Sequence, residues 1–367
     1  MNGGMVSERQ AVVLEGPVGA RMRVNGRELL YFGGTNYLGL AGRPELARGA
    51  IEAVAAYGTS FSASRQTSGT GVLHLELERR LAEFKGAEDA CIYASGYLGN
   101  QILLSALCRP EDVVICDEWA HPSIVEGVPR SVRDVRFYPH RDLEALARMI
   151  RSTRHGVIAV NGVEPGTGEI APLAELIELL PEDRFRLIVD DCHGTGVLGE
   201  HGRGTPEHVG VSSASLYQTE TMSKALGSFG GFVAGSAELC TRLRDTASYI
   251  GSTPLPPAVL GASLAAVEIA MHEPQLRERM RQNARYAAGK LQALGYEVSF
   301  DGAPILFIRG IDEDRAELIH SQLYEQGILV PFVHYPTAES EGRLRLAVSA
   351  MHTAEDIDRL SAAMKEV

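Results

Sequence analysis

The sequence predicts an α/β protein built on a doubly wound, mostly parallel sheet. Short β-rich runs alternate with helical segments from about residue 88 to residue 236, and most of these runs are continuously apolar. Strands of this kind are buried on both faces, as in a sheet that helices cover on each side. The length of 367 residues favours two domains, or one large domain with a smaller partner, over one small core.

Seven runs are the expected strands. They span residues 89–95, 112–118, 135–140, 156–163, 185–191, 215–221 and 230–236. The segments between them, such as LEALARMIRS and LAELIELL, carry apolar residues at helical spacing. The last two runs are too close together for an ordinary helical crossover, so we expect an antiparallel strand there.

From about residue 262 the pattern becomes that of a smaller α+β domain. A long helical stretch, broken near Pro274, precedes short strand-like runs at 296–300, 304–310 and 343–349 and a helix at 315–327. The N-terminal arm is expected to form a hairpin with its turn at Asn25–Gly26. We therefore divide the chain into an arm (1–40), a large α/β domain (41–265) and a small C-terminal domain (266–367).

Composition argues against some classes of function. The formal net charge of −12 weakly disfavours binding to nucleic acid or to anionic membranes. No apolar stretch reaches the about 18 residues that a membrane span needs, and the first ten residues hold no signal-peptide core, so a cytoplasmic location is expected. The five cysteines show no metal-ligand spacing, so reduced thiols and no metal are expected.

Polar residues follow several of the expected strands, where ligands of open α/β sheets bind. Gly96 and Tyr97 follow the first run and open a helical pattern, so backbone N–H groups there are suited to a phosphate. Asp190 ends a buried run and needs a cationic or strong donor partner, such as a protonated heterocyclic nitrogen. His121 follows the second run and is suited to stacking on a flat heteroaromatic ring.

Lys224 follows the sixth run, close to Thr221, Ser223 and a glycine-rich tail. Its small and apolar neighbours indicate burial. Burial lowers the pKa of a lysine and makes its amine a nucleophile for carbonyl groups. The hydroxyl groups of Thr221 and Ser223 are suited to bind a phosphate or a phenolic oxygen.

Each of these positions also has a plain structural interpretation. Gly96 would then belong to a tight turn, and Asp190 would cap the next element. His193 would be a hydrogen-bonded core histidine, His121 would lie in an exposed loop, and Lys224 would be an ordinary surface lysine. The residues alone leave these alternatives open.

Nine motifs occur in the order that one enzyme family uses. They are NYLGLAGRPEL, SGTGVLHLELERRLAEF, YASGYLGN, DEWAHPSI, GEIAPL, VDDCHGTGVLGEHGRG, TMSKALGSFGG, STPLPPA and GRLRLAVSAMHT, between Tyr31 and about Ile357. In these the chain resembles the α-oxoamine synthases, a branch of the fold type I enzymes that depend on pyridoxal 5′-phosphate (PLP). Members include 8-amino-7-oxononanoate synthase, 2-amino-3-ketobutyrate CoA ligase, 5-aminolevulinate synthase and serine palmitoyltransferase.

The resemblance implies a fold and a reaction. The fold would be a mostly parallel seven-stranded sheet domain plus a smaller C-terminal α+β domain. The reaction would condense an α-amino acid with an acyl-CoA thioester, releasing CoA and usually carbon dioxide, to give an α-amino ketone. The active unit would be a homodimer with shared active sites.

The resemblance also implies roles for residues around the cofactor. Lys224 would bind PLP covalently as a Schiff base, and Asp190 would pair with the protonated pyridine nitrogen. His193 would bond the phenolic oxygen, and His121 would stack on the ring. The phosphate would be held by residues from two segments: Gly96, Tyr97, Thr221 and Ser223.

Three further residues are implied for the substrate and the partner subunit. Thr253, in STPLPPA, would reach the phosphate of the neighbouring subunit. Arg345 would clamp the carboxylate of the amino acid, a task suited to its planar fork. Strand-like alternation would turn Arg343 and Arg345 toward an open cleft and the intervening leucines toward the core. Asn36, in NYLGL, would line the substrate site.

The chain departs from the family pattern near the phenolic oxygen. Pro165 occupies the position where the family usually has a serine, and Thr167 is the nearest candidate to replace its hydroxyl. The N-terminal arm, which helps to form the acyl-CoA entrance in several members, is short. These departures affect the second substrate more than the PLP site.

Two alternatives remain open from the sequence. One is a PLP enzyme of another class, such as an aminotransferase, which would pass an amino group to a keto acid and release no thiol. The other is a non-catalytic relative of the fold that acts as a binding protein. The presence of Lys224, Asp190 and His193 argues against the second alternative.

Overall fold

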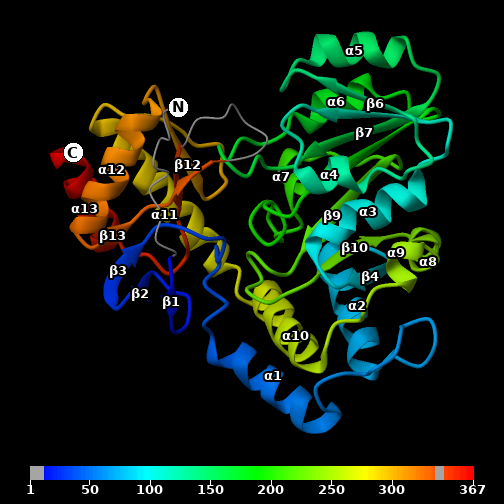
Figure 1. Ribbon diagram of the computed structural model, residues 1–367, viewed down its shortest axis with the longest axis horizontal. Helices are drawn as coiled ribbons and strands as arrows, with labels where there is room; N and C mark the ends of the chain where they lie inside the picture. The colour runs from blue at the N-terminus through cyan, green and yellow to red at the C-terminus, as the bar shows by residue number, and fades with distance from the viewer. Residues whose placement is uncertain (1–11, 335–342) are drawn as a thin grey trace, which may run out of the picture.

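The computed structural model describes residues 12–334 and 343–367. Two parts of this chain are distinct in Figure 1: a large part around one sheet, and a smaller part in which the N-terminal strands lie beside the C-terminal helices. Among the described helices, none is long and apolar enough to cross a membrane.

A seven-stranded sheet in the order β4-β10-β9-β8-β7-β5-β6 forms the large part. Strand β10 is antiparallel to both of its neighbours, and the other pairs are parallel. The expected doubly wound sheet, its seven strands and its antiparallel strand are therefore confirmed. The strands are β4 (Asp89–Tyr93), β5 (Val113–Asp117), β6 (Asp134–Tyr138), β7 (Gly156–Asn161), β8 (Phe185–Asp190), β9 (Leu216–Thr221) and β10 (Gly231–Gly235).

Helices bury both faces of this sheet. Val114 and Val157 belong to one apolar cluster with α3 (Gly96–Leu107), whereas Ile115 and Ile158 belong to another with α5 (Leu143–Arg151) and α6 (Leu173–Leu179). Neighbouring residues of one strand thus lie in different cores, which explains the continuously apolar runs. The other helices of this part are α2 (Val72–Lys85), α4 (Pro122–Gly127), α7 (Thr205–Val209), α8 (Ala237–Arg244) and α9 (Ala247–Ile250).

The smaller part contains a sheet in the order β11-β12-β15-β14 with three helices beside it. The expected break in the long helix is confirmed, because α10 (Pro257–His272) ends just before Pro274 and α11 (Gln275–Ala293) begins just after it. The remaining elements are β11 (Glu297–Ser299), β12 (Ile305–Arg309), α12 (Glu313–Glu325), β14 (Phe332–Val333), β15 (Arg343–Ala347) and α13 (Ala354–Glu366).

The N-terminal arm joins this smaller part. Strands β1 (Leu14–Glu15), β2 (Arg21–Val24) and β3 (Arg27–Tyr31) form a hairpin sheet, and β3 also pairs in parallel with β13 (Ile328–Leu329). The turn lies at Asn25 (φ 47°) and Gly26 (φ 77°), as expected for a two-residue hairpin loop.

Helix α1 (Pro44–Tyr57) packs on α10 through glycine. A Cβ atom on Gly49 would lie 2.6 Å from the carbonyl oxygen of Gly261, so this contact requires glycine. The expected boundary at residue 265 falls inside α10, and the domain limits stay a prediction.

Candidate active site

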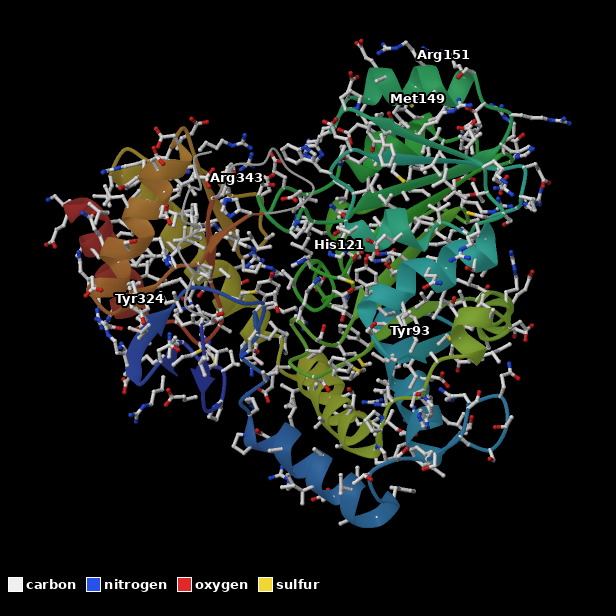
Figure 2. All side chains as sticks on the ribbon, in the orientation of Figure 1. Tyr93, His121, Met149, Arg151, Tyr324 and Arg343 are labelled. Carbon is white, nitrogen blue, oxygen red and sulfur yellow. The ribbon has the colours of Figure 1, made fainter. Side chains whose placement is uncertain are left out.

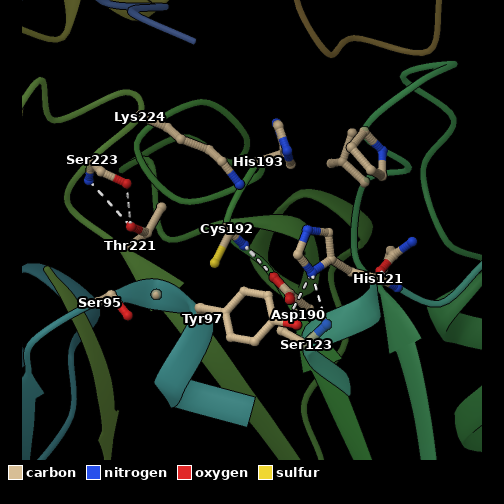
Figure 3. A pocket seen from close by; sticks show the side chains of 14 residues that line it. Ser95, Tyr97, His121, Ser123, Asp190, Cys192, His193, Thr221, Ser223 and Lys224 are labelled. Atoms are coloured by element: carbon tan, nitrogen blue, oxygen red, sulfur yellow. Dashed lines mark hydrogen bonds between the residues drawn. The ribbon is translucent and has the colours of Figure 1, made fainter. Parts of the chain in front are cut away.

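A cavity of about 230 Å³ lies at the carboxyl ends of the central strands. Segments that follow β4, β5, β7, β8 and β9 line it, which is where ligands of open α/β sheets bind. Figure 3 shows Lys224, His121 and Tyr97 directed into this space from three of these segments. In Figure 2, His121 lies near the centre of the molecule, where the two parts face each other.

Asp190, the last residue of β8, forms the floor of the cavity. Its side chain is 9% exposed, and its Oδ2 atom accepts a hydrogen bond of 2.7 Å from Nδ2 of Asn100. The Oδ1 atom accepts one of 3.2 Å from the backbone N–H of Cys192. This buried carboxylate is held by neutral donors and faces the cavity, as a site for a cationic ring nitrogen requires.

His121 caps the N-terminus of α4 with its side chain. Its Nδ1 atom accepts from the backbone N–H of Ser123 at 3.2 Å and lies 2.7 Å from Oγ of the same residue. Burial lowers the pKa of His121, and the nearby Lys224 lowers it further against the opposite effect of Asp190. The imidazole is therefore neutral, with its proton on Nε2.

His193 is a second neutral imidazole at the cavity. Burial holds its pKa well below the usual value, and Lys224 and Arg345 lower it further. Its Nδ1 atom lies 2.8 Å from the phenolic oxygen of Tyr37, which in turn accepts a hydrogen bond of 3.1 Å from Nη2 of Arg345. Residues from the arm and from β15 thereby position a histidine of the large sheet domain.

Lys224 lines the cavity and is half-buried, so the expected burial of this lysine is partial. Beside it, Oγ of Ser223 lies 2.7 Å from Oγ1 of Thr221, and Thr221 donates to the carbonyl oxygen of Gly230 at 2.9 Å. These two hydroxyl groups face the N-terminus of α3 across the cavity (Figure 3).

Gly96 begins α3 and comes close to this hydroxyl pair. A Cβ atom on Gly96 would lie 3.0 Å from Oγ1 of Thr221, so glycine keeps the space between the start of α3 and this hydroxyl open. The preceding Ser95 makes no side-chain cap. Helix N–H groups, hydroxyls and a cradle that a Cβ would fill suit a phosphate. Tyr97 lines the cavity with its ring and donates its hydroxyl proton to Glu126.

Arg345, Asn36 and Thr253 do not line this cavity. Arg345 is 5% exposed, with Nε bonded to the carbonyl oxygen of Pro165 at 2.7 Å and Nη1 to that of Gly34 at 3.0 Å. The leucines of β15 pack in the small core as expected, but the expected open face for Arg345 is wrong because the arm covers it. Thr253 is exposed.

Asn36 and Thr167 make local contacts instead. Asn36 accepts from the backbone N–H of Ala41 at 3.1 Å and donates to the carbonyl oxygen of Val18 at 3.3 Å. Thr167 donates to Glu169 at 3.2 Å and lines a separate cavity of about 310 Å³ between the two parts of the chain. The Thr167 hydroxyl therefore does not replace the hydroxyl of the family's serine. At Pro165, the carbonyl oxygen accepts a hydrogen bond from Arg345.

Comparison with known proteins agrees with this geometry. The profile of the family described as aminotransferase class I and II matches residues 27–364. An 8-amino-7-oxononanoate synthase of Geobacter metallireducens is 41% identical over 96% of this chain and 92% of its own length. One from Thermoanaerobacter pseudethanolicus is 37% identical over 98% and 92%. The chain belongs to the α-oxoamine synthase family.

Solved structures support the family fold. Serine palmitoyltransferase of Sphingomonas wittichii superposes with a TM-score of 0.91 at 26% identity, over 97% of this chain and 91% of that one. An 8-amino-7-oxononanoate synthase of Francisella tularensis gives 0.79 at 27% identity, over 92% and 97%. A serine palmitoyltransferase of S. paucimobilis holds PLP in its structure. This α-oxoamine synthase is thus a PLP-dependent C-acyltransferase of fold type I.

The cavity fits PLP by its own chemistry. It offers an amine, a buried carboxylate, two neutral imidazoles and a helix N-terminus cleared by glycine. Sequence reasoning found these groups but missed three of their partners, Asn100, Ser123 and Tyr37. All three lie inside the family motifs YASGYLGN, DEWAHPSI and NYLGL, close to Gly96, His121 and Asn36 respectively. Membership of a motif and proximity to a candidate residue were the signals available for them.

Proposed function

We propose that this α-oxoamine synthase is an 8-amino-7-oxononanoate synthase. Curated relatives with that name are 35–41% identical over nearly the whole chain, which supports this choice within the family. The product has nine carbons, with a ketone on C7 and an amino group on C8, so the bond that the reaction forms is the C7–C8 bond. One part is a seven-carbon acyl group with a distal carboxylate, and the other is the two-carbon remainder of alanine after loss of carbon dioxide.

The proposed reaction therefore balances simply. Alanine and a seven-carbon ω-carboxyacyl-CoA give the amino ketone, carbon dioxide and free CoA. Lys224 first removes the Cα proton of alanine. A bond forms between Cα and the acyl carbonyl carbon as the thioester breaks and CoA leaves, and the Cα–carboxylate bond then breaks to release carbon dioxide while Cα regains a proton. PLP, when bound, supplies an electron sink for the charge that develops at Cα.

The single observation that carries this proposal is the convergence of groups at one cavity. Lys224 supplies the amine that holds the cofactor and then takes a proton from Cα of the amino acid. Asp190 stabilises the positive charge on the ring nitrogen, which keeps the ring a good acceptor of electrons. Both side chains line the same 230 Å³ space.

The two histidines act as neutral groups. His121, with its proton on Nε2, would cover the ring of bound PLP and would donate to the acyl carbonyl oxygen. We assign the Tyr37 hydroxyl proton to Nδ1 of His193, 2.8 Å away, while the Tyr37 oxygen accepts from Arg345. The His193 proton then lies on Nε2, where it can bond the phenolic oxygen of the ring. Gly96, Tyr97, Thr221 and Ser223 surround the phosphate position.

Arg345 is proposed to recognise the amino-acid carboxylate in the bound state. Its guanidinium is held flat by Pro165 and Gly34, which fixes the direction of the planar fork. Arg345→Lys should weaken alanine binding about tenfold and leave PLP binding unchanged, as measured by spectral titration. Normal alanine binding by Arg345→Lys would place the carboxylate site elsewhere.

A homodimer is proposed as the active unit. The proposal is supported by exposed apolar side chains in segments that adjoin site residues: Tyr97 (45% exposed) lines the cavity, Phe229 (52%) follows Lys224 by five residues, and Ile250 (41%) precedes Thr253 by three. Thr253, three residues after Ile250, is exposed beside them and is proposed to reach the partner's phosphate. A Thr253→Val chain should bind PLP more weakly in a dimer of unchanged stability, and an unaltered PLP Kd would contradict a shared site.

The function is tested with one panel of substrates. The PLP-loaded protein is mixed with alanine, glycine or serine, then with a seven-carbon ω-carboxyacyl-CoA, a long-chain acyl-CoA or acetyl-CoA, while free thiol is followed. We expect thiol release with alanine and the carboxyacyl-CoA. Release with serine and the long-chain donor would favour a serine palmitoyltransferase. Transfer of the amino group to a keto acid without thiol would indicate an aminotransferase.

A further inference from the structure

Asn100 is buried at the centre of a hydrogen-bond network beneath the cavity. It is 0% exposed and lies one helical turn into α3, after Gly96. Its Nδ2 atom donates to Oδ2 of Asp190 at 2.7 Å and to Oγ of Ser123 at 2.8 Å. Its Oδ1 atom accepts from Oγ1 of Thr219 at 3.0 Å. Every polar atom of this amide is therefore bonded to protein.

Two partners of Asn100, Asp190 and Thr219, belong to a row of polar side chains across the sheet. Asn161, Asp190 and Thr219 are registered neighbours on β7, β8 and β9, so their side chains lie on one face. Asn161 accepts the backbone N–H of His121 at 3.0 Å, while Thr219 orients the Asn100 amide. The row thus fixes the backbone of one cavity residue and the carboxylate of another.

The network has one consistent direction of donation. A carboxylate only accepts, so the Asn100 atom that faces Asp190 must be its nitrogen, and its oxygen must face Thr219. Ser123 accepts from Asn100 and therefore turns its own proton toward Nδ1 of His121, 2.7 Å away. Reversal of the amide would leave a buried carboxylate facing a carbonyl oxygen, which is strongly unfavourable.

The packing of α4 on α3 keeps this geometry tight. A Cβ atom on Gly127, at the end of α4, would lie 2.9 Å from the backbone nitrogen of Gln101. The absence of that Cβ lets Ser123 approach Asn100 to hydrogen-bonding distance. Neither Asn100 nor Thr219 lines the cavity, so both act through other residues.

We infer that Asn100 is a positioning residue at the PLP site: it holds the Asp190 carboxylate toward the ring nitrogen and orients the Ser123 hydroxyl, which reinforces the backbone N–H of Ser123 in keeping the proton of His121 on Nε2. The inference concerns PLP binding alone. It is independent of which amino acid and acyl donor the enzyme uses.

The test measures PLP affinity without any substrate. The chain contains one tryptophan, Trp119, whose indole is two residues from His121, so its quenching reports PLP binding to apo protein. Asn100→Ala removes the donor, and we expect the Kd for PLP to rise about tenfold. Asn100→Asp places a second carboxylate beside Asp190, and we expect a rise of about a hundredfold.

Two further pairs separate positioning from general destabilisation. Thr219→Val leaves Asn100 in place but removes the hydroxyl that orients it, with an expected rise in Kd of about fivefold, whereas Thr219→Ser should restore wild-type affinity. Thr205→Val is the matched control, because Thr205 is equally buried and donates at 2.5 Å to Asp191, outside the cavity lining. It should lower the melting temperature and leave the Kd within about twofold.

The outcomes divide clearly. A Kd within about twofold of wild type for Asn100→Asp would overturn the inference, and so would an equal loss of affinity in Thr205→Val. Should Asn100→Asp fail to fold, the Thr219 pair decides: equal affinities for Thr219→Val and Thr219→Ser overturn the inference. If the wild-type protein binds PLP but the substrate panel shows another amino acid or acyl donor, the proposed function is contradicted and this inference is unaffected.

Discussion

The two histidines of the cavity are positioned by networks of different origin. His121 depends on Asn100, Ser123 and the row of polar residues on β7–β9, all within the large sheet domain. His193 depends on Tyr37 and Arg345, which are 156 and 152 residues away in sequence and belong to the arm and to β15. We call Asp190, His121 and their partners Asn100 and Ser123 the floor of the site, and His193, Tyr37 and Arg345 its roof. All residues of the floor belong to the large sheet domain, whereas the roof forms only when the arm and the smaller part pack on that domain.

This difference separates two tasks. The floor holds Asp190 and His121, which are proposed for the cofactor ring. The roof holds Arg345, which is proposed for the amino acid, and it supports His193, whose proposed bond to the phenolic oxygen is one of several contacts to the ring. Substitutions in the floor should therefore change PLP binding, and substitutions in the roof should change catalysis with the amino acid at unaltered PLP affinity. The following experiments test that division.

The largest effect is expected from Lys224→Ala. Loss of the amine removes covalent attachment of PLP and the base for the α-proton, so turnover should fall by about a thousandfold or more. Borohydride reduction followed by peptide mapping should show the pyridoxyl label on Lys224 alone in wild type and on no lysine in the variant. A label on another lysine would sink the assignment.

Asp190→Asn removes the negative charge from the floor of the site. A neutral amide no longer favours the protonated ring nitrogen, and each pKa unit lost corresponds to about 1.4 kcal/mol. We expect turnover to fall by at least about a hundredfold with some PLP still bound. Turnover within about threefold of wild type would show that the ring nitrogen has another partner.

Tyr37→Phe should break the roof without reaching the floor. His193 loses its phenolic partner and Arg345 loses one acceptor, so kcat/KM for the amino acid should fall about tenfold. The Kd for PLP should stay within about twofold. Tyr93→Phe is the matched control, because buried Tyr93 donates to the carbonyl oxygen of Phe232 at 2.6 Å and does not line the cavity. Equal kcat/KM losses in both variants would reject a specific role for the roof.

The sequence predicted some residues of the floor but not the contacts between them. Lys224, Asp190, His121 and Gly96 were predictable because each follows an apolar strand, and parallel strands bring their carboxyl ends to one edge. Asn100 was not, since its bond to Asp190 spans 90 residues and depends on which face of α3 meets the sheet.

For the roof, the sequence predicted the direction of the leucine side chains of β15 but not the burial of Arg345. Alternation along β15 correctly turned Leu344 and Leu346 into the small core. The same alternation does not show that the arm closes over the other side, where Gly34 and Tyr37 enclose Arg345. Tertiary contact between segments more than 300 residues apart decides that burial, and no local pattern encodes it.

The smallest effect is expected at an ionic link between the two parts of the chain. His140 lies 2.8 Å from Asp117 at the end of β5 and 3.5 Å from Glu169, which pairs with Arg309 of β12 at 2.6 Å. Burial alone would lower the pKa of His140, but the bonds to Asp117 and Glu169 outweigh it and raise this pKa to about 9. His140 and Arg309 together lower the pKa of Glu169 to about 2.

We expect this network, which reaches the smaller part through the Glu169–Arg309 pair, to make the stability of the protein depend on pH. Because the folded pKa of His140 exceeds its unfolded value of 6.5, its stabilisation is complete below about pH 6.5 and is lost as the pH rises to about 9. The melting temperature of wild type should therefore fall more steeply over that range than that of His140→Gln, by an amount equivalent to about 1 kcal/mol. His155→Gln, which breaks a histidine–aspartate pair inside the large part, is the control. We also measure kcat/KM for the amino acid and PLP affinity over the same pH range. A decline in kcat/KM in wild type but not in His140→Gln, with equal changes of PLP affinity in both, would show that the roof depends on contact between the two parts of the chain and that the floor does not.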